Sequence, residues 1–118
     1  MSRQETTTEQ IAQEWLALID VEKFEDAHSA ASDYLQENIS AEQLGVAIRG
    51  AREDLLAGGK RKLIGSQRFD KLPDAPPGDY IVSQYESRLE NDANRIETLT
   101  LVLQDAQWKV VGYFINNQ

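Results

Sequence analysis

The sequence predicts an α+β fold in which three N-terminal helices pack on a curved antiparallel sheet of four strands. Apolar residues recur at helical spacing in the first half of the chain. The second half is instead rich in β-branched and aromatic residues, in runs that are separated by prolines, glycines and polar turns. Helices followed by strands are typical of the segregated α+β class. The 118 residues suit a single domain with one core, in which we expect residues 1–6 to be disordered.

The first two predicted helices cover about residues 8–20 and 22–36. Thr7 precedes the first helix as an N-cap, and Gln10 stands three residues later, in capping-box spacing. Trp15 lies on the apolar side of this helix, which favours a role as a core anchor over one as a ligand-stacking ring.

The third predicted helix begins after Ser40, has Gln43 at the capping-box position and extends to about Leu56. Gly45 and Gly50 each weaken this helix by roughly 1 kcal/mol relative to alanine. Close packing against another element is one reason for a helix to carry them. A pair of glycines then supplies a helix stop.

The last two predicted strands form a hairpin whose turn centres on Asp105 and Ala106. The segments with strand character are about residues 62–69, 80–89, 95–103 and 108–114. With this turn, the facing pairs on one side of the hairpin are Leu103 with Trp108, Leu101 with Val110, Leu99 with Gly112 and Glu97 with Phe114. This side is apolar up to Glu97, so we expect the helices to cover it. The other side is amphipathic and suits water or a second subunit; it carries Thr98, Thr100, Val111, Tyr113 and Ile115.

The charge of the chain limits its partners. The formal net charge is -8 and the sequence pI is about 4.6, which argues against nucleic acids and anionic membranes as partners. No run approaches the roughly 20 apolar residues of a membrane span. Without cysteine and with His28 as the single histidine, we expect no metal site of cysteine or histidine ligands and no cofactor.

Glu97 is the polar residue with a physical argument for a special role. The predicted register turns it toward the helices, where a buried carboxylate needs a partner or a raised pKa. Arg68 or Arg52 could pair with it, and Tyr85 or Tyr113 could donate hydrogen bonds to it. A paired, structural Glu97 is the favoured interpretation; left unpaired in a cavity, it would be a candidate general base, with His28 as a second one.

A concavity between the helices and the curled sheet is the expected place for a small-molecule site. The tyrosines could line it, although tyrosines also fill cores. The candidate ligand-binding residues are Tyr34, Arg68, Tyr85, Glu97 and Tyr113.

Four segments resemble a known bacterial family. They are the helix around Trp15 with the acidic turn after Ile19-Asp20; the third helix leading to Lys60-Arg61-Lys62-Leu63; the loop from Leu72 to Tyr80 with Ser83-Gln84-Tyr85-Glu86-Ser87; and Glu97-Thr98-Leu99-Thr100-Leu101 with Trp108–Ile115. The chain resembles the bacterial domain of unknown function DUF4019, one of the cone-shaped, cystatin-like folds typified by nuclear transport factor 2. It departs from the family pattern at Leu44, where a tryptophan is common, and at Ala106, where a glycine is common.

The resemblance implies an exported, periplasmic or secreted protein, and it implies dimerisation through the sheet as a possibility, but it supplies no activity. We therefore expect a non-enzymatic domain that binds a small ligand or a protein partner. The alternative is an enzyme of the isomerase or dehydratase type that uses Glu97 as a pocket carboxylate.

Overall fold

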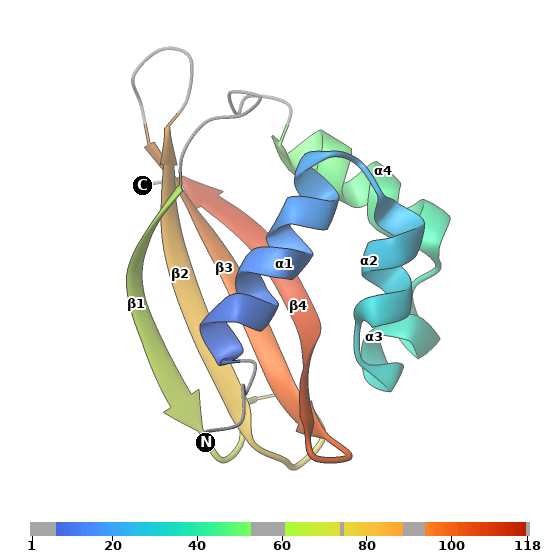
Figure 1. Ribbon diagram of the computed structural model, residues 1–118, viewed down its shortest axis with the longest axis vertical. Coiled ribbons are helices and arrows are strands. Elements are labelled where there is room, and N and C mark those ends of the chain that lie inside the picture. Colours follow the sequence, from blue (N-terminus) through green and yellow to red (C-terminus); the bar gives the residue numbers. More distant parts are fainter. Residues whose placement is uncertain (1–6, 53–60, 74, 89–93, 118) are drawn as a thin grey trace, which may run out of the picture.

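The computed structural model describes residues 7–52, 61–73, 75–88 and 94–117 (Figure 1). Two predictions fall outside these ranges: the disorder of residues 1–6, and the end of the third helix with its glycine stop. The elements in chain order are α1 (Thr8–Asp20), α2 (Phe24–Ala30), α3 (Asp33–Asn38), α4 (Ala41–Arg52), β1 (Arg61–Phe69), β2 (Tyr80–Arg88), β3 (Asn94–Gln104) and β4 (Gln107–Asn117).

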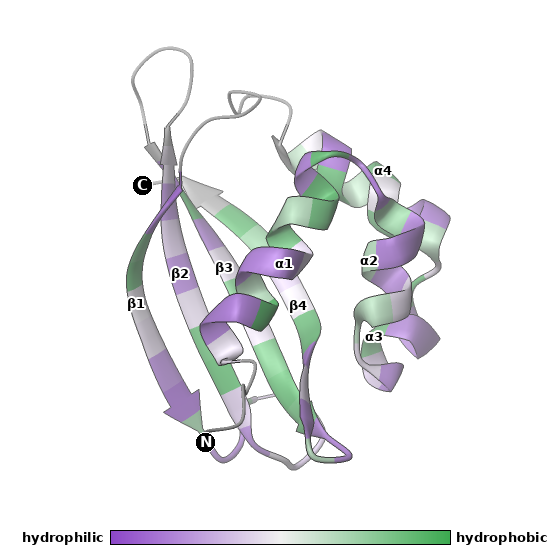
Figure 2. Ribbon diagram, in the orientation of Figure 1, coloured by the Kyte–Doolittle hydropathy of each residue, from purple (hydrophilic) through white to green (hydrophobic). Residues whose placement is uncertain are grey.

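The strands form one curved antiparallel sheet in the order β1-β2-β3-β4. α1 crosses one face of this sheet, and the other three helices lie beyond its β4 edge (Figure 1). The helices contact the sheet mainly through β3 and β4. Hydrophobic residues are concentrated in the same region, whereas the C-terminal end of β1 is hydrophilic (Figure 2). The architecture confirms the predicted α+β class.

Helix α1 begins and packs as its sequence predicts. The Gln10 backbone N–H donates to Oγ1 of Thr7 at 3.1 Å, and the Gln10 side chain accepts from the Thr7 N–H at 2.9 Å. The indole N–H of Trp15, which is buried, donates to the carbonyl of Ala27 at 2.9 Å. Trp15 is thus a core anchor that also attaches α2 to α1.

The prediction of a continuous second helix over residues 22–36 is wrong, because the chain breaks between α2 and α3. Ser32 has an extended backbone and caps α3, with its hydroxyl accepting from the Leu35 N–H at 3.2 Å. The Ser32 N–H itself donates to the carbonyl of Val110 in β4 at 2.8 Å. The Ser32 N–H thus bonds to the sheet and not to a carbonyl one turn earlier, as it would in a continuous helix. The described part of the chain therefore has four helices rather than three.

Helix α4 confirms the predicted capping box, in which Gln43 N–H donates to the Ser40 hydroxyl at 3.1 Å and Ser40 N–H to the Gln43 side chain at 2.9 Å. Gly45 lies directly against the ring of Phe24, since a Cβ at Gly45 would approach that ring to 2.8 Å. Close packing therefore explains Gly45. It does not explain Gly50, where a Cβ would meet nothing within 4 Å.

The β3–β4 hairpin has the predicted turn. Asp105 and Ala106 both have positive φ, 52° and 67°, as the two central residues of a type I′ turn require. The pairs Leu103 with Trp108 and Leu101 with Val110 are as predicted. Leu103 is nevertheless 36% exposed, because it lies next to the turn, at the end of the hairpin.

A β-bulge in β4 changes the register beyond Val110. Thr100 pairs with Gly112 and Leu99 with Tyr113, so the predicted pairs of Leu99 with Gly112 and of Glu97 with Phe114 are wrong. One extra residue in one strand moves every following side chain to the opposite face.

The bulge decides which aromatic ring of β4 enters the core. Tyr113 faces the helices beside the fully buried Leu99, whereas Phe114 is 51% exposed on the opposite face. The sequence had predicted the reverse for these two rings. Glu97 lies on the helix-facing side as predicted and is fully buried.

Candidate functional site

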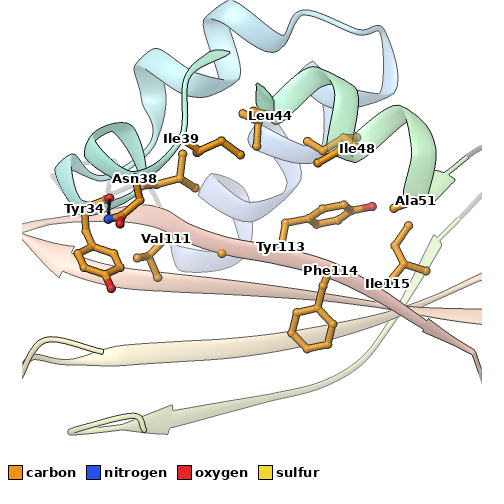
Figure 3. Close-up of a pocket in the computed structure, with 13 residues that line it drawn as sticks. Tyr34, Asn38, Ile39, Leu44, Ile48, Ala51, Val111, Tyr113, Phe114 and Ile115 are labelled. Carbon is orange, nitrogen blue, oxygen red and sulfur yellow. Dashed lines mark hydrogen bonds between the residues drawn. The ribbon is translucent and has the colours of Figure 1, made fainter. Parts of the chain in front are cut away.

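An apolar pocket of about 430 Å³ lies between helices α3 and α4 and strand β4 (Figure 3). We call it the α3–α4–β4 groove. Its lining residues are Tyr34, Leu35, Asn38, Ile39, Leu44, Ala47, Ile48, Ala51, Val111, Gly112, Tyr113, Phe114 and Ile115. None of these residues carries a charge, so the groove suits an uncharged apolar group.

Helix α4 forms one wall of the groove, and helical periodicity explains which of its residues lie there. Leu44, Ile48 and Ala51 recur at spacings of four and three residues, which puts them on one side of α4. This is the apolar stripe that the sequence predicts for the third helix. Ala47 lies on the same wall and is exposed, so part of the wall is open to solvent.

Strand β4 forms the other wall. Tyr113 and Ile115 point toward α4, and Phe114 points to the opposite side of the strand (Figure 3). Tyr34 closes one end of the groove from α3 and is 41% exposed.

Two polar side chains among the described residues of the groove already have hydrogen-bond partners. The Tyr113 hydroxyl donates to the carboxylate of Glu97. The Asn38 amide donates to the carbonyl of Tyr34 at 2.6 Å. The side chains of the groove therefore offer an occupant mainly apolar contact.

Beneath Tyr113 lies a charged network that we call the Asp20–Arg61–Glu97 bridge. Nε of Arg61 donates to Oε1 of Glu97 at 2.9 Å and Nη2 donates to Oε2 at 3.2 Å. Nη1 and Nη2 of the same guanidinium donate to the two carboxylate oxygens of Asp20, each at 2.9 Å. The bridge joins the C-terminus of α1, the start of β1 and the middle of β3.

The surroundings of Glu97 keep it ionised. Burial alone would raise its pKa, but the hydrogen bonds and charge of Arg61, together with the hydroxyls of Ser87 and Tyr113, hold the pKa of Glu97 below its usual value. Burial would also lower the pKa of Arg61, and Asp20 and Glu97 outweigh this and raise it. A carboxylate with three donors and a lowered pKa is a poor proton acceptor, which supports a structural role.

Arg68 is the wrong partner for Glu97. It lies 3.7 Å from Asp79 and places its guanidinium over the ring of Trp108, 5.4 Å from the ring centroid. The side chain of Arg52 lies outside the described residues. The actual partner, Arg61, escaped prediction because it belongs to a strand whose own bulge, between Leu63 and Gly65, hides its register.

Two other predicted residues have structural contacts. The Tyr85 hydroxyl donates to the carboxylate of Glu9 in α1 at 3.0 Å, and burial is the main cause that raises the pKa of Tyr85. A ring nitrogen of His28 lies 2.6 Å from the carbonyl of Ile39, which ties α2 to the segment before α4.

The groove therefore unites two of the five predicted ligand-binding residues, Tyr34 and Tyr113. Glu97 reaches it only through the Tyr113 hydroxyl, and neither Tyr85 nor Arg68 lines it. The lining residues from α4 and, apart from Tyr113, those at positions 111–115 in β4 were not predicted as a site. The apolar residues of α4 recur at helical spacing in the sequence, but this pattern fits a buried core as well as a groove.

The part of the chain that the structure describes contains neither a candidate metal site nor a candidate membrane span. No group of three histidine, aspartate or glutamate side chains there could hold a metal ion. None of the helices in those ranges has the length and apolar character to span a membrane.

Fold and groove together define a small α+β domain with an apolar groove at the edge of its sheet. The family model described as protein of unknown function (DUF4019) matches residues 11–113. The chain belongs to the DUF4019 family, which confirms the resemblance seen in its sequence. No curated protein and no solved structure matches the chain.

Proposed function

We propose that this protein is a non-enzymatic binding domain that takes an uncharged apolar group into the α3–α4–β4 groove. The observation that carries the proposal is the groove itself, with about 430 Å³ of space and no charged side chain among the described residues that line it. Pockets for small ligands typically have roughly 300–1,000 Å³ and mostly apolar walls.

The state of Glu97 supports binding over catalysis. An enzyme of the isomerase or dehydratase type needs an ionisable group that reaches into the cavity without a salt-bridge partner. Glu97 is instead 2.9 Å from Nε of Arg61 and accepts from Ser87 and Tyr113 as well. Of these residues, only Tyr113 lines the groove, with its ring.

The sharpest test fills the groove without altering the core. Ala47→Trp places a large ring on the exposed part of the α4 wall, and Val46→Trp is the matched control, because Val46 is 65% exposed and does not line the groove. The probe is N-phenyl-1-naphthylamine, an uncharged dye that fluoresces in apolar surroundings. We expect saturable dye binding that Ala47→Trp weakens about tenfold or more and Val46→Trp leaves unchanged. Equal binding by both variants, or no binding by the wild type, would overturn the proposal.

We further propose that two copies pair through the sheet face that the helices leave uncovered, and that the protein works in the periplasm or outside the cell, as the family resemblance implies. The exposed Phe114 and the half-buried Thr100 lie on this face and support pairing there. Light scattering on the wild type and on Thr100→Arg tests the pairing, with a dimer expected only for the wild type. Cell fractionation tests the location.

A further inference from the structure

The α3–α4–β4 groove runs along the edge of a strand rather than beneath a sheet face. Its lining includes every residue from Val111 to Ile115 in succession. Tyr113 and Ile115 belong to the helix-facing side of β4, and Gly112 and Phe114 to the other side. A cavity under a sheet face is lined by alternate residues, because successive side chains point to opposite faces. Consecutive lining therefore places the backbone edge of β4 in the wall of the groove.

This edge is open to a further strand. In the described part of the chain, β4 pairs with β3 and with no other strand. At Val110 the edge is occupied by the N-cap of α3, because the Val110 carbonyl accepts a hydrogen bond from the Ser32 N–H at 2.8 Å. From Val111 onward the edge faces the groove instead. An open edge presents backbone donors and acceptors that an extended chain can pair with.

We propose that the occupant of the groove is an extended peptide segment that adds to β4 as a fifth strand. This inference rests on the proposed function and names the class of partner. Backbone groups of the peptide pair with β4, and every second side chain enters the groove between β4 and α4. Residues 111–115 span about 17 Å at the rise of a strand, so about five residues of the partner pair here.

The charges around the groove predict which residues flank the paired segment of the peptide. The described lining residues are uncharged, whereas Asp33 and Glu37 are exposed on α3 and the whole chain carries a formal charge of -8. We therefore expect apolar residues at alternate positions, flanked by lysine or arginine.

The test selects a partner and then removes its backbone hydrogen bonds. Random short peptides displayed on phage are selected on the wild-type protein and counter-selected on Ala47→Trp. The best sequence is synthesised in three forms: unmodified, N-methylated at the amides that face β4, and N-methylated at the amides that face away. We expect enriched sequences to alternate apolar and polar residues, with basic ends. We expect methylation toward β4 to weaken binding about tenfold or more and methylation on the other side to change it less than about threefold.

Hydrogen exchange of the protein gives the second measurement. Bound peptide should slow exchange of edge amides between Val111 and Ile115, and N-phenyl-1-naphthylamine should not, because it supplies no carbonyl partner. Equal loss of affinity for both methylated forms, or unchanged exchange at β4, would overturn strand addition. Dye binding with no peptide enriched would overturn strand addition and leave the proposed function intact. Failure of both dye and peptide would overturn the two together.

Discussion

The hydroxyl of Tyr113 donates a hydrogen bond to the buried carboxylate of Glu97 while its ring lines the α3–α4–β4 groove. The same ring packs on Trp15, with 5.8 Å between the ring centroids. One side chain of β4 thus contacts the groove, the core and the Asp20–Arg61–Glu97 bridge. Trp15 therefore lies one ring away from the groove.

Tyr113→Phe separates these roles. It keeps the ring and removes the donor to Glu97, so we expect the free energy of unfolding to fall by about 1–2 kcal/mol, since a hydrogen bond to a charged group is lost. Dye binding in the groove should stay within about threefold of the wild type. Urea unfolding followed by Trp15 fluorescence measures the first quantity and dye titration the second. Tyr34→Phe, on an exposed ring, is the control and should leave stability unchanged. A large loss of dye binding in Tyr113→Phe would contradict the apolar character assigned to the groove.

Glu97→Gln should make stability less sensitive to acid. The folded protein holds the pKa of Glu97 below its usual value of about 4.3, so ionised Glu97 stabilises the fold above that pH. This stabilisation is lost as the pH falls through the lower pKa of the folded state. At neutral pH the substitution should cost roughly 3 kcal/mol, because it breaks a buried pair and leaves the Arg61 charge less well compensated.

The measurement is urea unfolding of the wild type and Glu97→Gln at several pH values between neutrality and acid. The gap between the two proteins should be largest near neutral pH and should narrow below about pH 4. A gap that stays constant over this range would show that Glu97 has the same pKa in the folded and the unfolded protein, which contradicts the lowered pKa. A general-base role predicts something else, namely a folded variant of wild-type stability.

The two glycines of α4 give a matched pair. Gly45→Ala should destabilise the protein by about 1–3 kcal/mol, because its methyl group would approach the ring of Phe24 to 2.8 Å. Gly50→Ala should stabilise it by up to about 1 kcal/mol, since the site is open and alanine is the better helix former. Thermal unfolding of both variants tests the pair. Equal shifts of the melting temperature in one direction would contradict the packing described for α2 and α4.

Ala106→Gly should stabilise the hairpin. Ala106 adopts a φ of 67°, which costs an L-residue roughly 1 kcal/mol relative to glycine. We therefore expect the free energy of unfolding to rise by about 1 kcal/mol, as measured by urea unfolding. The opposite result is expected for Ala17→Gly, at an exposed position of α1. If Ala106→Gly also lowered stability, the type I′ turn would be wrong.

The local parts of the fold were predictable from sequence, because their causes lie within a few residues. Thr7 with Gln10 and Ser40 with Gln43 fix two helix starts by capping. The turn at Asp105 and Ala106 fixes the first pairs of the hairpin, as far as Leu101 with Val110. The inward position of Glu97 follows from alternation along β3 alone.

The parts that failed depend on residues far apart in the chain. The break before α3 is stabilised by the hydrogen bond from Ser32 to Val110, and helical periodicity does not register such a contact. The bulge after Val110 is a property of two paired strands, so alternation along β4 could not place it. Arg61 meets Glu97 only because β1, β2 and β3 pair in particular registers.

Val111 is the one residue of the bulge that has no partner in β3, because Leu101 pairs with Val110 and Thr100 pairs with Gly112. Removing the codon for Val111 would therefore give unbroken pairing and leave the other facing pairs unchanged, with the phenol of Tyr113 still opposite Leu99. The interior carboxylate would keep its phenolic partner. A single in-frame deletion at this point would thus straighten the edge of the sheet without rebuilding its interior.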